Sequence, residues 1–220
     1  MLSDAEILGA IFNKEIVVTP LVHSGQLGTT IDLRLGTEFS VKKMDKLPFF
    51  DVFRFREDSK KNGIETERYN ERVRISNLGR PFFLHPGQLA LGSTLEHIEL
   101  DPRIGAFLEG RSSWAREGLN VHTTAGFIHP GSKGVIVLEL FNNGQHALPL
   151  FPGMRVAQLL PYRLSQASQE PYSLTSRYHG MTETRIGVPW EDWEFEVFDR
   201  AQGARDKETE SSDKAPGNDA

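Results

Sequence analysis

The sequence predicts an all-β fold, either a sandwich, a jelly roll or a barrel, with one short helix at the N-terminus. Pro-Gly pairs at 86–87, 130–131 and 152–153 each separate two apolar runs, which is typical of turns between strands. Many short runs joined by turns favour such a fold over a parallel α/β sheet. We expect strands at 81–85, 88–93, 104–108, 121–128, 134–141, 147–151 and 154–163.

The N-terminal helix is predicted from its cap. Ser3 and Glu6 have the spacing of a capping box, in which the serine hydroxyl and the glutamate carboxylate satisfy first-turn N–H groups. Apolar residues then follow at helical spacing. We expect one buried helical face made of Ile7, Leu8, Ile11 and Phe12.

Three segments lie outside this pattern. Residues 42–75 are charged and weakly periodic, and predict a long excursion with some strand. The aromatic segment 190–198 predicts a docking strand or an interface patch. Residues 203–220 contain no aromatic or large aliphatic side chain and cannot repay the entropy of ordering. We therefore expect a single domain over residues 1–200 and a disordered tail at 201–220.

Composition excludes several classes. No apolar run among the 220 residues approaches the length that spans a bilayer, and the N-terminus lacks the pattern of a secretory signal. The absence of cysteine excludes disulfides and thiolate catalysis. A formal net charge of −5 disfavours a general nucleic-acid binder. These features predict a cytoplasmic protein with neither a membrane nor a nucleic acid as its partner.

Residues 110–139 carry the candidate chemistry. Guanidinium and hydroxyl donors that suit phosphate oxygens come from Arg111, Ser112, Ser113 and Arg116. A surface turn with solvated arginines would have the same sequence pattern. Glu139 is a single acid within an apolar strand, so it is costly to bury unless it has an interaction partner or a functional role. It could equally be an edge-exposed acid or an ion-pair partner of an arginine. Together the two features indicate chemistry on a nucleotide.

This stretch, GRSSWAREGLNVHTTAGFIHPGSKGVIVLE, closely resembles the dCTP deaminases of the trimeric dUTPase superfamily. Further matches are residues 30–36, the segment FFLHPGQLALGSTLE from Phe82, and Pro152-Gly153-Met154 leading to Gln158-Leu159. The resemblance spans about residues 1–181 in family order. It implies a distorted jelly roll, or dUTPase-like β-barrel, assembled as a homotrimer.

The resemblance implies zinc-independent hydrolytic deamination of dCTP to dUTP and ammonia in pyrimidine deoxynucleotide metabolism. Glu139 would be the general base, Arg116 would help position the base and the water, and Ser112 would complete the catalytic set. Arg111, Ser112, Ser113 and Arg116 would grip the triphosphate, with the grip and the glutamate of one site coming from neighbouring subunits. We expect Mg²⁺ to arrive with the nucleotide and dTTP to be a candidate inhibitor.

Zinc is not expected, because the cysteine ligands of zinc deaminases are absent and the seven histidines are scattered. One of them, His122, is expected to be a satisfied core residue. The resemblance extends the nucleotide-binding set, beyond the grip and Glu139, to Ala125, His129, Val137, Leu138, Gln158, Tyr172, Arg177 and Met181.

Some of these positions depart from the family pattern. His129 replaces an aspartate that accepts the sugar 3′-hydroxyl, Arg177 replaces a lysine and Met181 replaces a glutamine. The run Ala125-Gly126-Phe127 instead resembles bifunctional members that also cleave the triphosphate. Two alternatives therefore stay open. One is a bifunctional dCTP deaminase/dUTP diphosphatase or a dUTPase, which would release dUMP, and the other is a non-catalytic nucleotide-binding paralogue.

Overall fold

The computed structural model describes residues 1–21, 24–43, 52–62, 70–172, 176, 178–184, 187, 192–198 and 200–201. The chain groups into two compact units, one formed by residues 1–43 with 70–185 and the other by residues 44–69 with 186–220. The expected single domain over residues 1–200 stays a prediction. The expected tail at 201–220 lies, apart from its first residue, outside the described residues.

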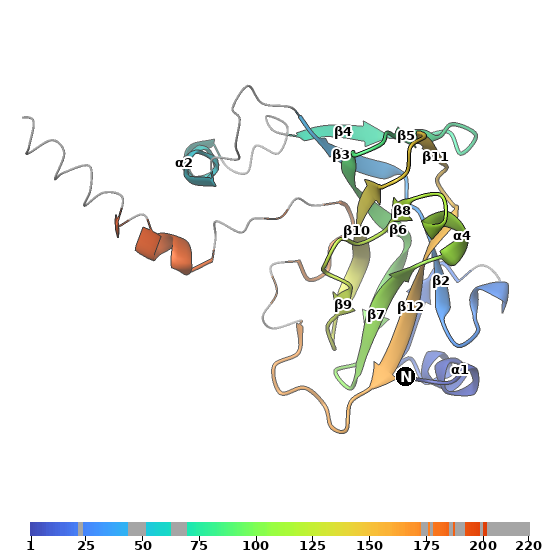
Figure 1. The fold of residues 1–220 in the computed structure, drawn as a ribbon. Helices are drawn as coiled ribbons and strands as arrows, with labels where there is room; N and C mark the ends of the chain where they lie inside the picture. Colours follow the sequence, from blue (N-terminus) through green and yellow to red (C-terminus); the bar gives the residue numbers. More distant parts are fainter. Residues whose placement is uncertain are drawn as a thin grey trace, which may run out of the picture. The chain divides into compact units, whose positions relative to one another are not determined.

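The first unit is built from antiparallel strands in three sheets (Figure 1). The largest sheet has the order β4-β3-β6-β10-β8, and β1 also pairs with β6. Its strands are β1 (Ile16–Thr19), β3 (Glu38–Lys42), β4 (Asn70–Arg74), β6 (Leu89–Leu100), β8 (Leu119–Asn120) and β10 (Lys133–Asn142).

A second sheet has four strands in the order β2-β12-β7-β9, and a third pairs β11 with β5. Their bounds are β2 (Ile31–Arg34), β5 (Phe82–Leu84), β7 (Ile104–Gly110), β9 (Phe127–Ile128), β11 (Leu148–Leu150) and β12 (Arg155–Arg163). One core joins the sheets, since Ile98, Leu138 and Leu140 of the largest sheet cluster with Leu33, Leu108 and Leu159 of the second. The expected all-β class is therefore confirmed.

Helix α1 (Asp4–Phe12) begins as the sequence predicts, because both hydrogen bonds of the Ser3–Glu6 capping box are present. Its predicted face is only half right. Ile7 is fully buried, but Leu8 is 54% and Phe12 88% exposed, and Ala10 is buried in their place. The hydrogen bond from the Leu2 N–H to the Pro161 carbonyl, at 2.8 Å, ties the start of the helix to β12 and selects which face turns inward.

All three Pro-Gly pairs form turns, as predicted. In each, the residue after the glycine donates its N–H to the carbonyl of the residue before the proline: Gln88 to His85, Ser132 to His129, and Met154 to Phe151. The glycines have positive φ angles, of 71° at Gly87, 76° at Gly131 and 89° at Gly153. Proline followed by a left-handed glycine is the pattern of a type II turn.

The expected strand at 121–128 is not continuous. Residues 119–120 form β8 and residues 127–128 form β9, while 121–126 are an irregular loop. The loop directs its backbone groups elsewhere: the Thr123 N–H is bonded to a side chain of β10, and the Gly126 carbonyl accepts from the Leu108 N–H at 2.7 Å. This loop borders the candidate site.

The second unit contains helix α2 (Val52–Asn62) and a short helix over residues 194–198. The rings of Phe53 and Phe195 lie 6.2 Å apart, and the Arg56 Nη1 donates to the Phe195 carbonyl at 2.6 Å. The strand expected within residues 42–75 is confirmed as β4, but α2 was not predicted. The helix at 194–198 replaces the docking strand considered for that segment, because Phe195 packs at helical spacing against Phe198. No described helix is long and apolar enough to span a bilayer.

Candidate nucleotide site

Glu139 lies near the middle of β10 and pairs in register with Leu91 of β6. Its neighbours Leu138 and Leu140 are fully buried, and because strand residues alternate, Glu139 faces away from that core. Its Oε2 accepts the Thr123 N–H at 2.8 Å, and the Thr124 N lies 3.5 Å away. The Oε1 atom accepts no hydrogen bond from the described residues. The half-buried carboxylate is thus oriented by the backbone and keeps one oxygen open.

The loop at 121–126 holds this orientation through packing at both ends. Val121 is buried at one end. At the other end, a Cβ on Gly126 would lie 3.0 Å from the His122 Cε1 and 3.1 Å from the Leu108 carbonyl oxygen. A side chain at position 126 would therefore crowd His122 and β7, and glycine eases the close approach of the loop to β7. Ala125, between these anchors, is exposed.

His122 is not the satisfied core residue that the sequence suggests. Its ring is half-buried, and its Nε2 lies 3.7 Å from the Glu109 Oε2. Among the described residues, its buried Nδ1 has no hydrogen-bond partner. The strand expected here would have fixed the ring within the core, whereas the irregular loop leaves it at the margin of the core.

Helix α4 (Ser112–Ala115) presents the candidate phosphate donors. Arg111 caps it, Trp114 packs against the core, and Gly118 ends the turn with φ +96°. Ser112, Ser113 and Arg116 are exposed. Among the described residues, none of their side chains has a hydrogen-bond or ion-pair partner. Three adjacent donors are therefore free to meet an anion.

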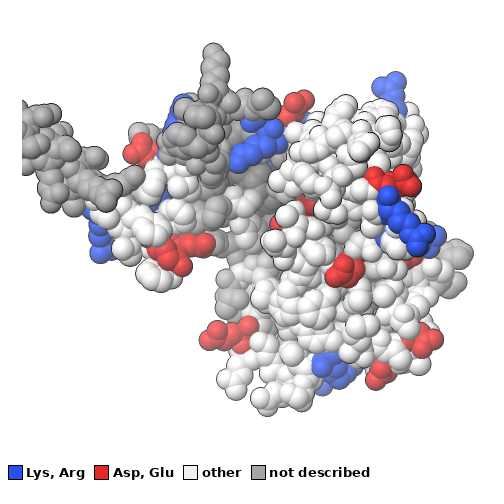
Figure 2. Space-filling model, viewed as in Figure 1, with Lys and Arg blue, Asp and Glu red and all other residues white. Residues whose placement is uncertain are grey.

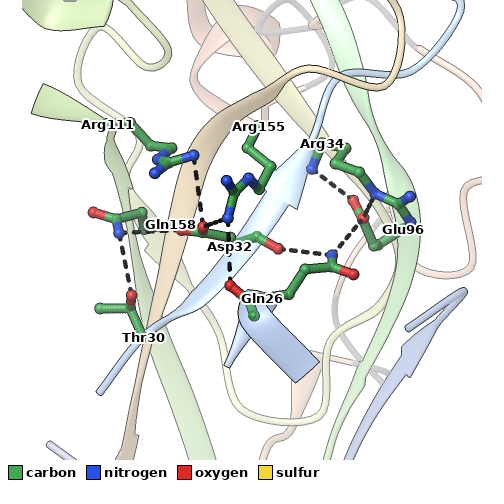
Figure 3. A network of polar contacts seen from close by, with 9 residues as sticks. Gln26, Thr30, Asp32, Arg34, Glu96, Arg111, Arg155 and Gln158 are labelled. Atoms are coloured by element: carbon green, nitrogen blue, oxygen red, sulfur yellow. Dashed lines mark hydrogen bonds and ion pairs between the residues drawn. The ribbon is translucent and has the colours of Figure 1, made fainter. Parts of the chain in front are cut away.

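Arg111 belongs to a polar network around Asp32 of β2 (Figure 3). The Asp32 Oδ2 lies 3.0 Å from the Arg155 Nη1 and 3.6 Å from the Arg111 Nη1. Its Oδ1 accepts from the Gln158 Nε2 at 3.2 Å, and the same amide donates to the Thr30 hydroxyl. One nearly buried carboxylate thus contacts Arg155 and Gln158 of β12 and Arg111 at the start of α4.

The network continues to Glu96 through Gln26, whose amide nitrogen lies 3.2 Å from the Asp32 carbonyl oxygen and 3.3 Å from the Glu96 Oε1 (Figure 3). Glu96 is fully buried and pairs with the Arg34 Nε at 2.6 Å. It lies where the register between β6 and β10 shifts, between the pairs Val135–His97 and Val137–Ser93. We attribute the inward direction of Glu96 to this bulge.

His129 lies at the turn between β9 and β10. Its ring stacks on Tyr172, with centroids 5.2 Å apart and planes 8° apart, and meets Phe127 edge-on at 4.7 Å. A pocket of about 380 Å³ opens beside this stack. It is lined by His129, Pro130, Ser168, Glu170, Tyr172, Ser176 and Tyr178.

The remaining expected residues fall in different places. Val137 is half-buried on β10, whereas the Leu138 side chain is in the core, so only its backbone could reach a ligand. Gln158 is engaged with Asp32. Met181 pairs through its backbone with Gly134. Arg177 lies outside the described residues.

Within one chain the expected residues form two groups. Arg111 and Gln158 meet at Asp32, and His129 meets Tyr172, but no recorded interaction among the described residues joins Glu139 to Arg111 or Arg116. Sequence reasoning missed Asp32 and Arg155. The available signal was an acid between Ile31 and Leu33, the same apolar context that drew attention to Glu139.

Among the described residues, no three histidine, aspartate or glutamate side chains come together as a metal site. On the face of the first unit in Figure 2, lysine and arginine side chains are scattered among acidic ones and form no continuous basic stripe over the described residues.

Burial raises the pKa of Tyr162 above its ordinary value.

Comparison with known proteins agrees with this architecture. A family described as dCTP deaminase-like matches residues 1–164. A protein named dCTP deaminase, dUMP-forming, from Methanosphaera stadtmanae is 33% identical over 199 residues, which is 89% of this chain and 96% of that protein. One named dCTP deaminase from Shewanella frigidimarina is 39% identical over 186 residues, or 83% of this chain and 94% of that protein.

Among solved structures, 2′-deoxycytidine 5′-triphosphate deaminase from Agrobacterium tumefaciens matches with a TM-score of 0.55 and 18% identity. The match covers 74% of this chain and 48% of that one, and it supports the fold alone. The resemblance drawn from residues 110–139 is confirmed by the family match and by the relatives. This chain belongs to the dCTP deaminase-like family.

Proposed function

We propose that this protein is an enzyme that deaminates dCTP to dUTP and ammonia. The observation that carries the proposal is the geometry of Glu139, a strand carboxylate with one oxygen fixed by a backbone N–H and the other open. Its relatives' names support the substrate, since they include both dCTP deaminase and its dUMP-forming variety. Asp32, by contrast, has both oxygens engaged.

In the proposed reaction, the oxygen of a water molecule forms a bond to C4 of cytosine while Glu139 accepts a water proton. This proton passes to ring N3. The second water proton passes, again through Glu139, to the amino group, which leaves as ammonia when the C4–N bond breaks. The oxygen stays on C4 as a carbonyl. Only a base that can take up and return protons from a fixed position serves both steps.

The triphosphate would be held by the free donors of α4, namely Ser112, Ser113 and Arg116, together with Arg111. The exposure of the first three supports this role. Because no hydrogen bond or ion pair among the described residues joins the donors to Glu139, the proposal places them in composite sites of a homotrimer, with Arg116 also positioning the base and the water. Mg²⁺ would be bound through the phosphates, and no step requires zinc.

The sugar and the base would lie near Ala125, Val137 and the backbone of Leu138, with His129 and Tyr172 at the sugar. Gln158, Arg177 and Met181 complete the proposed set. The aromatic stack of His129 on Tyr172 supports a sugar-side platform. We further propose that dTTP competes for this site, and that the protein acts in the cytoplasm with neither a membrane nor a nucleic acid as a partner.

A second candidate is a bifunctional enzyme that releases dUMP. The run Ala125-Gly126-Phe127 and the dUMP-forming relatives favour it. His129 disfavours it, because a neutral imidazole orients a phosphoanhydride-cleaving water less well than the family aspartate. A non-catalytic paralogue is the third candidate, which the intact set of Glu139, Ser112 and Arg116 disfavours.

The test is to incubate the pure protein with dCTP and Mg²⁺ and to separate the products by chromatography while measuring ammonia. The first candidate predicts equimolar dUTP and ammonia. The bifunctional candidate predicts dUMP and pyrophosphate with the ammonia, and the paralogue predicts binding without any product. A parallel reaction with a zinc chelator should leave turnover unchanged. A parallel reaction without Mg²⁺ should show weaker turnover.

A further inference from the structure

A segment that follows His129 by about forty residues lines part of the pocket beside it. We define the strap as the described residues 171–172 and 178–181. At one end the Tyr172 N–H donates to the Pro130 carbonyl at 3.0 Å. At the other end the Gly180 N–H donates to the Lys133 carbonyl at 2.7 Å, and the Met181 carbonyl accepts the Val135 N–H at 2.9 Å. The strap is thus paired, backbone to backbone, with the turn that leads into β10.

Two glycines, Gly131 of the turn and Gly134 at the start of β10, leave room for the strap. Gly134 has φ +133°, and a Cβ there would lie 2.7 Å from the Met181 carbonyl oxygen and 2.9 Å from the Met181 nitrogen. Those atoms are backbone and cannot rotate away as a flexible side chain would. Gly131 faces the other end of the strap, where its Cβ would lie 2.8 Å from the Pro171 Cβ.

The strap supplies one side of the pocket. Tyr172 and Tyr178 of the strap line the cavity of about 380 Å³ together with His129 and Pro130 of the turn. The stack of Tyr172 on His129 joins the two sides. Loss of the pairing at Met181 would therefore free the Tyr178 end of the strap, while Tyr172 stays held by Pro130 and His129.

We infer that Gly134 is a positioning residue for nucleotide binding: its missing side chain lets the strap pair with the start of β10 and so shapes the pocket for the sugar and the base. This inference rests on the proposed function. It separates binding from chemistry, because Glu139 is oriented by the loop at 121–126 and not by the strap. A weakened strap should raise KM and leave kcat nearly intact.

The test compares Gly134→Ala with Gly153→Ala. Both substitutions put a side chain at a positive φ, but nothing lies within 4 Å of a Cβ at Gly153, whereas the strap backbone lies against Gly134. Both variants therefore strain the backbone, and only Gly134→Ala also adds a clash with the strap. Amide hydrogen exchange without nucleotide is measured over residues 133–136 and 178–182, followed by steady-state kinetics with dCTP.

In Gly134→Ala we expect exchange in both segments to quicken at least about tenfold, because the two backbone hydrogen bonds open. We expect KM for dCTP to rise about tenfold and kcat to change less than about threefold, while Gly153→Ala shows neither change. Unchanged exchange in a folded Gly134→Ala protein, or a KM equal to that of Gly153→Ala, would overturn the inference. If the wild-type protein does not turn over dCTP, the proposed function fails, and exchange alone decides whether Gly134 holds the strap.

If Gly134→Ala does not fold, Gly180→Val repeats the test from the strap side. Nothing lies within 4 Å of a Cβ at Gly180, but its φ of +73° is strongly disfavoured for a β-branched residue. The Gly180 N–H would then no longer reach Lys133, and the same faster exchange and higher KM are expected. Wild-type exchange and KM in this variant would count against the strap's role.

Discussion

Asp32 and Glu139 occupy the same kind of sequence context and have opposite surroundings. Each lies between two apolar residues of a strand that are themselves fully buried. Asp32 is 7% exposed, and both of its oxygens are engaged by Arg155, Arg111 and Gln158. Glu139 is held only through one oxygen, by the backbone of the loop at 121–126.

The difference concerns what each acid is free to do. A buried carboxylate surrounded by fixed donors stabilises the groups around it, and removing it leaves buried cations unpaired. A carboxylate with one open oxygen can accept a proton from a ligand without dismantling its own support. We therefore propose that Asp32 is a scaffold for the phosphate side of the site and that Glu139 is the group that does the chemistry.

The largest expected effect is that of Glu139→Gln. The amide keeps the shape of the side chain but cannot accept a proton, so kcat for deamination should fall by about 10³-fold or more. Thermal unfolding and dCTP binding should change little. Glu71→Gln, on the exposed strand β4, is the matched control and should keep wild-type turnover. Near-normal kcat in Glu139→Gln would remove Glu139 from the role of base.

Mixing variants tests whether the two regions of one site come from different subunits. Arg116→Ala and Glu139→Gln should each be inactive alone. When they are unfolded, mixed in equal amounts and refolded as random trimers, about a quarter of the sites should receive an intact Arg116 from one subunit and an intact Glu139 from its neighbour.

The control mixture contains Glu139→Gln with the double variant Arg116→Ala/Glu139→Gln, which has no intact Glu139 and should stay inactive. Sedimentation should give the mass of a trimer for every sample. No recovered activity in the first mixture, or wild-type protein active as a monomer, would place both groups in one chain.

The sequence predicted most of the strands between residues 81 and 163, and the turns between them, because their signals are local, whereas β1, β2 and β3 were not predicted. A Pro-Gly pair specifies its own turn, and the capping box of Ser3 and Glu6 needs only four residues. The buried face of α1 was predicted wrongly because Leu8 and Phe12 have the right spacing, and the choice between Phe12 and Ala10 depends on where the chain docks. The broken strand at 121–126 was missed because the Thr123 N–H of the loop bonds the Glu139 side chain and not the backbone of a neighbouring strand.

In the candidate site, too, the sequence predicts what depends on local pattern and misses what depends on contacts between distant segments. Glu139 stood out because a single acid in an apolar run is visible in the sequence. Asp32 has the same pattern, but its role depends on Arg155 and Gln158, which lie more than a hundred residues later and come close only because β2 pairs with β12. The need for glycine at position 134 was also hidden, because it depends on Met181.

Asp32→Asn should have a smaller and different effect. Losing the charge leaves Arg155 and Arg111 without their shared anchor, and because both guanidinium groups are partly exposed the stability should fall by only about 1–2 kcal/mol. KM for dCTP should rise about tenfold as the arginines lose their fixed orientation, with kcat less affected.

The matched control is Glu96→Gln in the same network. Glu96 is fully buried against Arg34, so its loss should cost more stability, about 3 kcal/mol, without changing KM. Urea unfolding and steady-state kinetics measure both quantities. An Asp32→Asn protein that loses stability but keeps its KM would show that the Asp32 network serves the fold alone.

The smallest effect concerns His129, and it tests whether the pocket side of the site lacks a second acid. The ring of His129 stacks on Tyr172 where family members usually carry an aspartate. If that carboxylate is needed to orient the water that cleaves the phosphoanhydride, the wild-type protein should release dUTP, and His129→Asp should raise the share of dUMP or lower KM about threefold, since a carboxylate accepts a hydroxyl more strongly than a neutral imidazole. His129→Asn separates charge from shape, because the amide accepts a hydrogen bond without a charge and should leave the product as dUTP. A wild-type protein that forms dUMP and pyrophosphate, with no accumulating dUTP, would show that His129 or another residue already fills the role of the missing acid.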